Sequence, residues 1–511
     1  MEEYGLDGLA ASAEAVLPGL GPLAAGLARL AGQVCREVTL EAMEALVTGQ
    51  GRELLRGLVQ LSLDTQAAAE VKAAGVTGAD GVMRTRGERG HARTVVTTVG
   101  AVRVRRIGYR AGVTGAGSLF PRDAVLNLPP RRYSWQLQRL AVMFTGSGSY
   151  EQAHEFVRAV TGVSIGKRQL QQVTAAAAAD AEQFCQGQGQ GQGQEQDPAV
   201  PLVISADGKG VAMRPGARRR RAKAPDMRVR TFRHRRGTGE KGHKRMAETG
   251  AVFDVQVPDG PPRTPEQILR PDPDPRARPA APRAVNRWYA CDITADRAVT
   301  IGKVFDHAER RDPGHQRTWI ALADGDTHQI GLIQAEAGTR GIPVTIVIDF
   351  IHVLEYLWKT AWCFHQPRDP AIEDWVTAQA MAILHGRVSD VIAHIESLAV
   401  QHPPAGPEHA KIIRTTLHYL DAKQPYMDYP RALAAGWPIA TGVIEGACRH
   451  LVQDRMAITG ARWALPGAQA ILWLRAINAS SDTGTYWHWH ITQEHQRNHL
   501  SRYQPGSDLA A

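Results

Sequence analysis

Three short apolar segments between residues 200 and 350 each run into an aspartate, and this recurrence restricts the possible folds more than any other feature. Uninterrupted apolar runs of this kind are typical of strands that are buried on both faces. The segments and their aspartates are 202–204 with Asp207, Trp319–Ala323 with Asp324, and Val344–Ile348 with Asp349. Because ligands bind at the carboxyl ends of strands in open α/β sheets, Asp207 and Asp324 are candidate functional residues.

The order of the surrounding elements predicts a mixed α/β sheet. Residues 253–257 and 288–293 are expected to form two further strands, and helical patterns follow the last two apolar segments at 329–337 and 353–362. Three strands, then strand, helix, strand and helix, describe a sheet of the ribonuclease H kind. Residues 370–422 have apolar residues at helical spacing, so an all-helical insertion is expected before the rest of the core.

Shifts in composition divide the chain into segments. Residues 186–194 alternate Gln and Gly and are interpreted as part of a linker. Nine prolines in 258–282 predict an extended or disordered excursion. The predicted division is an N-terminal helical region (1–93), a β-ribbon and helix-turn-helix DNA-binding domain (94–185), the linker (186–198), the first part of the catalytic core (199–364), the helical insertion (365–436) and the C-terminal part of the core (437–511).

The region before the linker has a pattern typical of DNA-reading domains. A strand pair is expected on either side of Gly100, with one apolar and one basic face. Ser149 with Gln152 is a capping-box signature for a helix that Gly162 ends, and Ser164 is expected to cap a second helix. The second helix is expected to present Lys167, Arg168 and Gln169 to the major groove. An ordinary helical hairpin has the same pattern.

The positive charge of the chain is concentrated in one segment. Residues 214–246 hold 14 Lys or Arg against two acids, a local balance of +12, and since the whole chain carries +9 the remainder carries −3. This concentration suits neutralisation of DNA phosphates, although a solvated basic loop has the same composition. The arginines expected to bind DNA are Arg218, Arg219, Arg220, Arg221, Arg233, Arg235 and Arg236. No apolar run suits a membrane span, so a cytoplasmic, nucleoid-associated protein is expected.

A third acid completes a possible metal site. Glu445 follows Gly436-Trp437-Pro438, and with Thr441 as the helix cap it falls in the first turn, where the helix dipole favours an ionised carboxylate. Together with Asp207 and Asp324 it offers hard oxygen ligands that suit Mg²⁺ or Mn²⁺. Two such ions could activate a water or a 3′-hydroxyl for phosphoryl transfer. Taken alone, an Asp-Gly after a strand is more often a turn than a ligand.

Six motifs in order along the chain are similar to those of a known family. They are SLFPRDAVLNLPPRRYS (118–134), KRQLQQV (167–173), VISADGKGVAMR (203–214), ALADGDTHQIGLI (321–333), VIDFIHVLEYLWKTAWCF (347–364) and ATGVIEGACRHLVQDRMAITGARW (440–463). They resemble the ISKra group of bacterial insertion-sequence transposases, relatives of the Mutator-like elements, and the similarity runs from about residue 94 to 500. The Pro-rich excursion at 258–284 departs from what is expected of that group.

The resemblance implies a ribonuclease H-like core with a catalytic triad of two aspartates and a glutamate, interrupted by a helical insertion. It assigns the triad and its metal ligands to Asp207, Asp324 and Glu445. Asp349 and His352 match an Asp-x-x-His signature whose implied role is to contact DNA or support the site, and packing in the core is the alternative for His352. Asp326 lies two residues from Asp324 and is a rival for the second ligand position.

The function that the resemblance implies is DNA transposition. Such an enzyme recognises the terminal inverted repeats of its element, cleaves the ends to free 3′-hydroxyls, and joins them to target DNA. Pairing two ends implies a homodimer or a higher oligomer on double-stranded DNA. Two alternatives stay open at this point: a captured transposase that binds DNA without catalysis, and a ribonuclease H-like nuclease that hydrolyses DNA without joining it.

Overall fold

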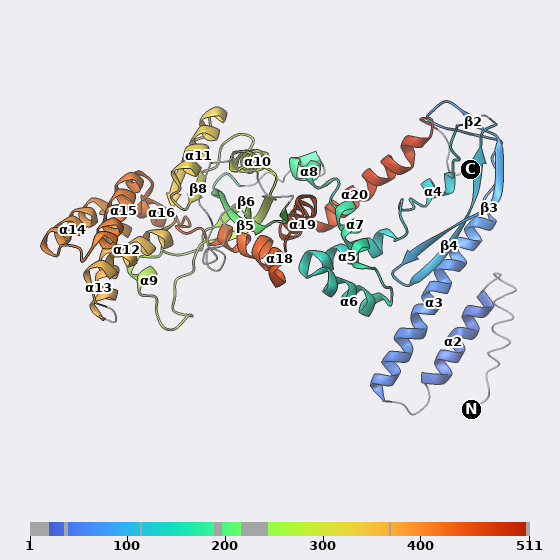
Figure 1. Cartoon of the computed structure of the whole chain (residues 1–511), viewed down its shortest axis with the longest axis horizontal. Coiled ribbons are helices and arrows are strands. Elements are labelled where there is room, and N and C mark those ends of the chain that lie inside the picture. Colours follow the sequence, from blue (N-terminus) through green and yellow to red (C-terminus); the bar gives the residue numbers. More distant parts are fainter. Residues whose placement is uncertain are drawn as a thin grey trace, which may run out of the picture. The chain divides into compact units, whose positions relative to one another are not determined.

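The structure is a computed structural model that describes residues 20–34, 39–112, 115–188, 197–215, 244–366 and 369–506 (Figure 1). The chain forms two compact units, one made of residues 1–180 with 486–511 and the other of residues 181–485. Both helices and strands are present, as expected for an α/β protein. The sequence-based division differs at two places, because it assigns residues 486–511 to the catalytic core and residues 181–185 to the DNA-binding domain.

The first unit begins with two packed helices and two strand pairs. These elements are α2 (Leu20–Val34), α3 (Leu40–Ala68), β1 (Val76–Thr77), β2 (Met83–Arg84), β3 (Arg86–Thr97) and β4 (Gly100–Arg110). The antiparallel hairpin of β3 and β4 confirms the predicted strand pair, and β3 begins earlier than expected. Gly100 has a φ of 125° in the turn, which a residue without a Cβ adopts at little cost.

A group of helices follows the hairpin. It contains α4 (Pro121–Val125), α5 (Trp135–Ser147), α6 (Tyr150–Thr161) and α7 (Lys167–Ala177). The predicted capping box of Ser149 and Gln152 is present at the start of α6. The expected cap of the next helix was wrong: α7 begins after Gly166, and the Gln169 side chain accepts a hydrogen bond from the Gly166 N–H in place of a Ser164 cap.

The C-terminal helix belongs to the first unit because its polar and aromatic side chains pack there. It is α20 (Thr483–Asn498), and a short 3₁₀ turn, η7 (Leu500–Arg502), follows. Buried Asp180, just after α7, accepts hydrogen bonds from His490, at 2.6 Å, and from Arg497. Burial acts to raise the pKa of Asp180, but these two hydrogen bonds outweigh it and the pKa is lowered.

The second unit is built on a five-stranded mixed sheet. Its strands are β5 (Leu202–Ala212), β6 (Lys244–Gln256), β7 (Arg283–Asp292), β8 (Trp319–Ala323) and β9 (Val344–Ile348). The order across the sheet is β7-β6-β5-β8-β9, with β5, β6 and β7 antiparallel and β8 and β9 parallel to β5. All five predicted strands are present, and the bounds of β8 and β9 agree with the prediction.

Helices connect and cover the strands. Before the insertion they are α8 (Ala181–Gln183), the π-helical turn η1 (Phe184–Gln188), α9 (Pro265–Leu269), α10 (Arg297–Arg311), α11 (Thr327–Arg340) and α12 (Phe350–Phe364). Leu202, Ile204 and Ala206 of β5 pack with residues of α10 and α11 in the main core. Because strand side chains alternate, Asp207 faces the opposite side of the sheet from Ala206. The sequence analysis missed α10 between β7 and β8.

The predicted all-helical insertion is present. It consists of α13 (Ala371–Leu384), α14 (Val388–Gln401), α15 (Pro407–Lys423), η4 (Gln424–Tyr426) and α16 (Tyr429–Ala434). Two of its tyrosines contact the parallel edge of the sheet: Tyr419 donates a hydrogen bond to the Asp324 carbonyl at 3.3 Å, and Tyr429 to the Ile348 carbonyl at 3.0 Å. Burial raises the pKa of both phenols, which keeps them as donors.

The chain then returns to the sheet through an irregular helix. Its parts are α17 (Gly442–Ala447), the π-helical turn η5 (Cys448–Gln453), α18 (Asp454–Met456) and the 3₁₀ turn η6 (Ile458–Gly460), and α19 (Leu465–Ala479) follows. The apolar side chains of this segment are buried, at Ile444, Ala447, Cys448, Leu451, Val452 and Met456. Single π turns inside helices often occur at functional sites, and this one follows α17, the short helix that carries Glu445.

Candidate active site

The three acids of the predicted triad line one open cavity of about 520 Å³ in the second unit. The walls come from β5, the turn after β8, the start of α12, and the segment from Thr441 into η5. The lining residues are Ala206, Asp207, Lys209, Asp324, Ile351, His352, Glu355, Thr441, Gly442, Ile444, Glu445, Gly446, Cys448, Arg449 and Gln453. Residues that lie far apart in the sequence therefore share one surface.

Asp207 lies within β5, opposite Thr249 of β6. It is half-buried, and its Oδ1 accepts a 2.6 Å hydrogen bond from the N–H of Gly208. The Cys448 thiol lies beside it: burial raises the pKa of this thiol, and the negative charge of Asp207 raises it further. Cys448 is therefore a neutral neighbour that adds no competing charge to the carboxylate.

Asp324 follows β8 directly and is also half-buried. Its Oδ1 accepts a 2.9 Å hydrogen bond from the backbone N–H of Asp326. Gly325 next to it has a φ of 94°, and a Cβ there would lie 2.7 Å from the ring of Tyr419. The shape of this turn thus depends on a glycine and on a tyrosine from the helical insertion.

Asp326, the rival for the second ligand position, has other partners. It is the N-cap of α11, where its side chain accepts a 3.0 Å hydrogen bond from the N–H of His328. Its other oxygen forms an ion pair with Arg297, which also contacts Glu248 at 3.2 Å. Asp326 does not line the cavity, so the geometry favours Asp324 between the two.

Asp349, His352 and Glu445 form the one group among the described residues whose possible ligand atoms all lie within 4.8 Å of one another. Asp349 is fully buried, His352 is half-buried and Glu445 is exposed. The sequence analysis gave Asp349 and His352 only a supporting role, whereas the structure places their possible ligand atoms within 4.8 Å of those of Glu445. His352 lines the cavity and is not packed in the core.

Thr441 joins two of these acids. Its hydroxyl lies within hydrogen-bonding distance of Asp349 Oδ2 and, at 2.8 Å, of Glu445 Oε1. It occupies the N-cap position of α17 but makes no side-chain cap, so the expected capping role was wrong. A hydroxyl has a single hydrogen and can donate to only one carboxylate at a time.

Two cations also line the cavity and were missed by the sequence analysis. Lys209 is exposed two residues after Asp207 on the same strand, and Arg449 is exposed four residues after Glu445. Both spacings were readable in the sequence, since i and i+2 share a face of a strand and i and i+4 share a face of a helix. Carboxylates flanked by Lys and Arg suit a phosphodiester, which needs metal ligands at the reacting phosphate and positive charge along the backbone.

The predicted DNA-reading residues lie in the first unit and in the basic segment. Lys167, Arg168 and Gln169 are exposed in the first turn of α7, which packs against α5 and α6. Lys167 forms an ion pair with Glu151, and Gln169 accepts a 2.6 Å hydrogen bond from the Tyr133 hydroxyl, whereas Arg168 has no such partner among the described residues. Residues 218–236 with their seven predicted DNA-binding arginines lie outside the described residues.

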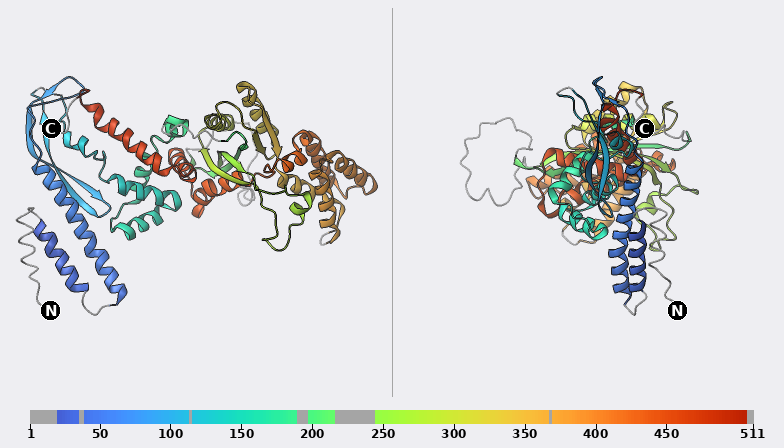
Figure 2. Two further views of the ribbon diagram at one scale, coloured as in Figure 1. Left: turned by 180° about the vertical axis from the view of Figure 1, so that it is seen from behind. Right: turned by 90° about the vertical axis from the view of Figure 1, so that its right-hand side faces the viewer.

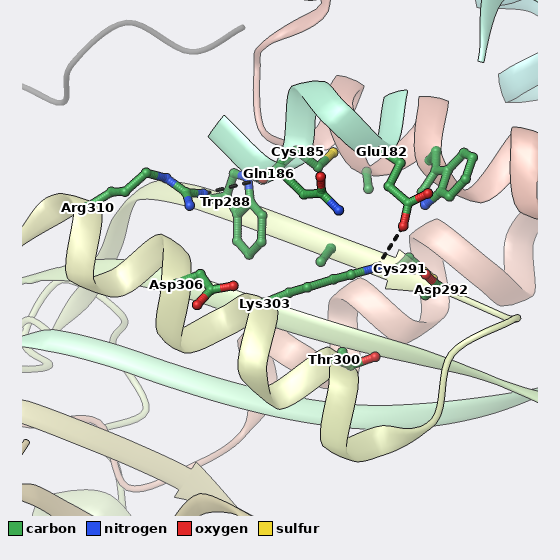
Figure 3. A pocket seen from close by; sticks show the side chains of 13 residues that line it. Glu182, Cys185, Gln186, Trp288, Cys291, Asp292, Thr300, Lys303, Asp306 and Arg310 are labelled. Carbon is green, nitrogen blue, oxygen red and sulfur yellow. Dashed lines mark hydrogen bonds and ion pairs between the residues drawn. The ribbon is translucent and has the colours of Figure 1, made fainter. Parts of the chain in front are cut away.

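A second, smaller cavity lies elsewhere in the second unit and differs in kind. Figure 3 shows Lys303 directed at its acidic neighbours: its Nζ is 2.8 Å from Asp292 and 3.9 Å from Glu182. The cavity holds about 20 Å³, enough for about one water molecule. Burial raises the pKa of two thiols in its walls, Cys185 and Cys291, to about 12. The size of this cavity makes it part of the core packing and no candidate for an active site.

Comparison with protein-family models and with curated proteins found no match to this chain. Within the described ranges, no helix has both the length and the apolar composition that a membrane span requires.

Proposed function

We propose that this chain is a DNA transposase of the ISKra group, which cleaves the ends of its element and joins their 3′-hydroxyls to target DNA. The observation that supports this best is that Asp207, Asp324 and Glu445 line one cavity together with Lys209 and Arg449. An acid set of this kind beside two cations fits phosphoryl transfer on a polyanion better than it fits a small neutral substrate.

The order of the strands in the second unit also supports the proposal. In a ribonuclease H-like sheet the first strand is central, with two antiparallel strands on one side and two parallel strands on the other. The order β7-β6-β5-β8-β9 has this arrangement. The all-helical insertion before the segment with Glu445 agrees with the interrupted core that the resemblance implies.

The side chains of the cavity fit a hard divalent cation such as Mg²⁺ or Mn²⁺, because Asp207, Asp324 and Glu445 all offer carboxylate oxygens. A bound cation would supply Lewis acidity at the scissile phosphate. Lys209 and Arg449 would hold the neighbouring phosphates through charge-assisted hydrogen bonds. Asp349 acts through Thr441, whose hydroxyl fixes the position of the Glu445 carboxylate.

DNA recognition in this proposal involves α6 and α7 and the basic segment. The exposed first turn of α7 would read bases, and the arginines at 218–221 would bind phosphates. Neutralising these four arginines should weaken binding to all sequences and reduce the slope of log K against log salt by about 4. Arg168→Ala should instead change sequence preference. An unchanged salt slope would exclude the basic segment from the interface.

The test of catalysis is strand transfer in vitro with Mg²⁺ or Mn²⁺ and DNA that carries the sequences flanking the gene. Asp207→Ala, Asp324→Ala and Glu445→Ala should each lose joined product, and Asp326→Ala serves as the matched acidic control outside the cavity. Products longer than the labelled input would distinguish joining from hydrolysis alone. The proposal is wrong if the three cavity variants remain fully active.

A further inference from the structure

The Pro-rich excursion of residues 258–282 is tied to the helical insertion. It was expected to be extended or disordered, but it contains the short helix α9, whose start has a capping box. Glu266 of α9 lies 3.4 Å from His385, and Arg270, just after α9, lies 3.8 Å from Asp374 of α13. Figure 2 shows α9 beside the helices of the insertion. The excursion therefore has a defined position over this part of the second unit.

A cavity of about 440 Å³ lies between the excursion and the turn that follows α16. We call it the excursion cavity. Its two sides are in close contact at one point, where a Cβ at Gly436 would lie 2.6 Å from the Val257 side chain. Sites for small organic ligands have volumes of roughly 300–1,000 Å³, so the size suits such a ligand. The rings in its walls belong to Pro258, Pro261, Pro262, Pro279, Pro282 and Trp437.

Few groups in these walls can bind the polar part of a ligand. Proline has no backbone N–H, and among the described lining residues Arg263 and Trp437 are the two whose side chains donate hydrogen bonds. Asp259 is the one acid among them, and it is exposed, so solvent screens its charge. The two donors suit a ligand with an acceptor group, and the rings of the walls suit a flat apolar body.

Arg263 is a cation without a counter-charge. Its side chain has no hydrogen-bond or ion-pair partner in the part of the chain that the structure describes, and its Nε is fully buried. Burial lowers the pKa of Arg263, with no acidic neighbour opposing the effect. Arg270 on the same excursion differs, because it pairs with Asp374. An unpaired, half-buried charge is unfavourable, and an anion bound in the cavity would neutralise it through charge-assisted hydrogen bonds.

We propose that the excursion cavity binds a small aromatic anion. The carboxylate or phosphate of this ligand pairs with Arg263, and its ring packs against Trp437 and the prolines. This inference goes beyond the proposed catalytic function and stands independently of it, since the binding requires neither DNA nor a metal ion.

The first experiment measures binding to the full chain by isothermal titration calorimetry, with naphthoate and naphthyl phosphate as probes. At least one anion should bind with saturation, and the tighter one identifies the acidic group as carboxylate or phosphate. Arg263→Met should raise its dissociation constant at least about 10-fold, and the neutral analogue naphthalenemethanol should bind the wild type as weakly. Arg270→Met is the matched control and should bind like the wild type.

Three results would overturn the proposal. They are no saturable binding of either anion at concentrations up to about 1 mM, equal binding of the neutral analogue, and wild-type affinity in the Arg263→Met variant. Asp259→Asn tests the sign of the ligand charge and should bind the anion as well as the wild type or more tightly. A loss as large as that of Arg263→Met would show that the cavity binds a cationic group and would also contradict the proposal.

Thermal unfolding separates a binding role of Arg263 from a structural one. Without ligand, Arg263→Met should unfold at the same temperature as the wild type or higher, because the substitution removes an unpaired charge and keeps an apolar side chain. The tighter-binding anion should raise the unfolding midpoint of the wild type and of Arg270→Met, and leave that of Arg263→Met unchanged. An Arg263→Met variant that unfolds at a lower temperature than the wild type would make Arg263 part of the packing and overturn the proposal.

Discussion

The turn after β8 and the turn after β9 each carry an aspartate between a parallel strand and a helix, yet the two carboxylates make different contacts. After β9, Asp349 is itself the N-cap of α12, accepting a 2.8 Å hydrogen bond from the N–H of Ile351, and it is fully buried. After β8, Gly325 adds a turn and Asp326 becomes the cap of α11, so Asp324 remains at the cavity. Two more residues, Asp324 and Gly325, lie between the strand and the cap after β8 than after β9, and Asp324 is the candidate ligand.

The largest expected effect of this difference is on activity. Asp324→Asn should reduce strand transfer by more than about 100-fold, because loss of a residue that supports a metal ligand already costs 10–100-fold and Asp324 is proposed as a ligand itself. The midpoint of thermal unfolding should change little, since Asp324 caps no helix. Strand transfer is measured as joined product per unit time. An Asp324→Asn variant with activity near that of the wild type would show that the two turns do not differ in function.

Asp349→Ala should have its main effect on stability. Asp349 is fully buried, so loss of its cap should lie at the upper end of the usual range for such caps, and the free energy of unfolding should fall by about 2 kcal/mol, while the Thr441 hydroxyl keeps Glu445 as a partner. Denaturant unfolding of the full chain measures it. Asp349→Asn keeps an acceptor oxygen and should lose less. An alanine variant as stable as the wild type would contradict the assigned role.

Gly325→Ala tests the residue that makes the turns differ. A side chain there combines a φ of 94° with a contact to Tyr419, and the strain should cost about 1–3 kcal/mol and lower activity by moving Asp324. Gly331→Ala on α11 is the matched control, because a Cβ there meets nothing within 4 Å. That control should gain about 0.5–1 kcal/mol of stability. Equal behaviour of the two variants would show that the turn tolerates a side chain.

Asp326→Ala should have the smallest effect. Loss of the α11 cap costs about 1 kcal/mol, and the exposed ion pair with Arg297 adds little. Strand transfer should stay within a few-fold of wild type at a temperature where the variant is folded. A loss as large as that of Asp324→Asn would make Asp326 part of the site after all.

Much of the fold of both units could be predicted from local patterns. The apolar runs at β8 and β9 and the capping box at Ser149 depend on residues close in sequence, which is why the structure agrees with them. The helix α10 was missed because the region between β7 and β8 was read only for strands, although Asp296 caps it and buried residues such as Ile301 and Phe305 recur along it.

The grouping of the site residues was harder to predict. Asp349 approaches Glu445 through the Thr441 hydroxyl, a contact between segments more than 90 residues apart that no spacing rule reveals. Thr441 was expected to cap α17 because threonine is common at that position, but its hydroxyl lies within hydrogen-bonding distance of two carboxylates and makes no cap. Long-range side-chain contacts of this kind depend on how the strands and the insertion pack, so no local sequence pattern predicts them.

The two tyrosine hydrogen bonds from the insertion have a practical consequence for any shortened version of this chain. Tyr419 and Tyr429 donate hydrogen bonds to the carbonyl oxygens of Asp324 and Ile348, so the insertion stabilises the parallel edge of the sheet. Replacing residues 365–436 with a short linker would preserve the connectivity of the core but would remove the Tyr419 ring that packs against Gly325. The region between the strands and Glu445 therefore supports the turn that places Asp324 at the cavity, and a shortened chain has to keep it.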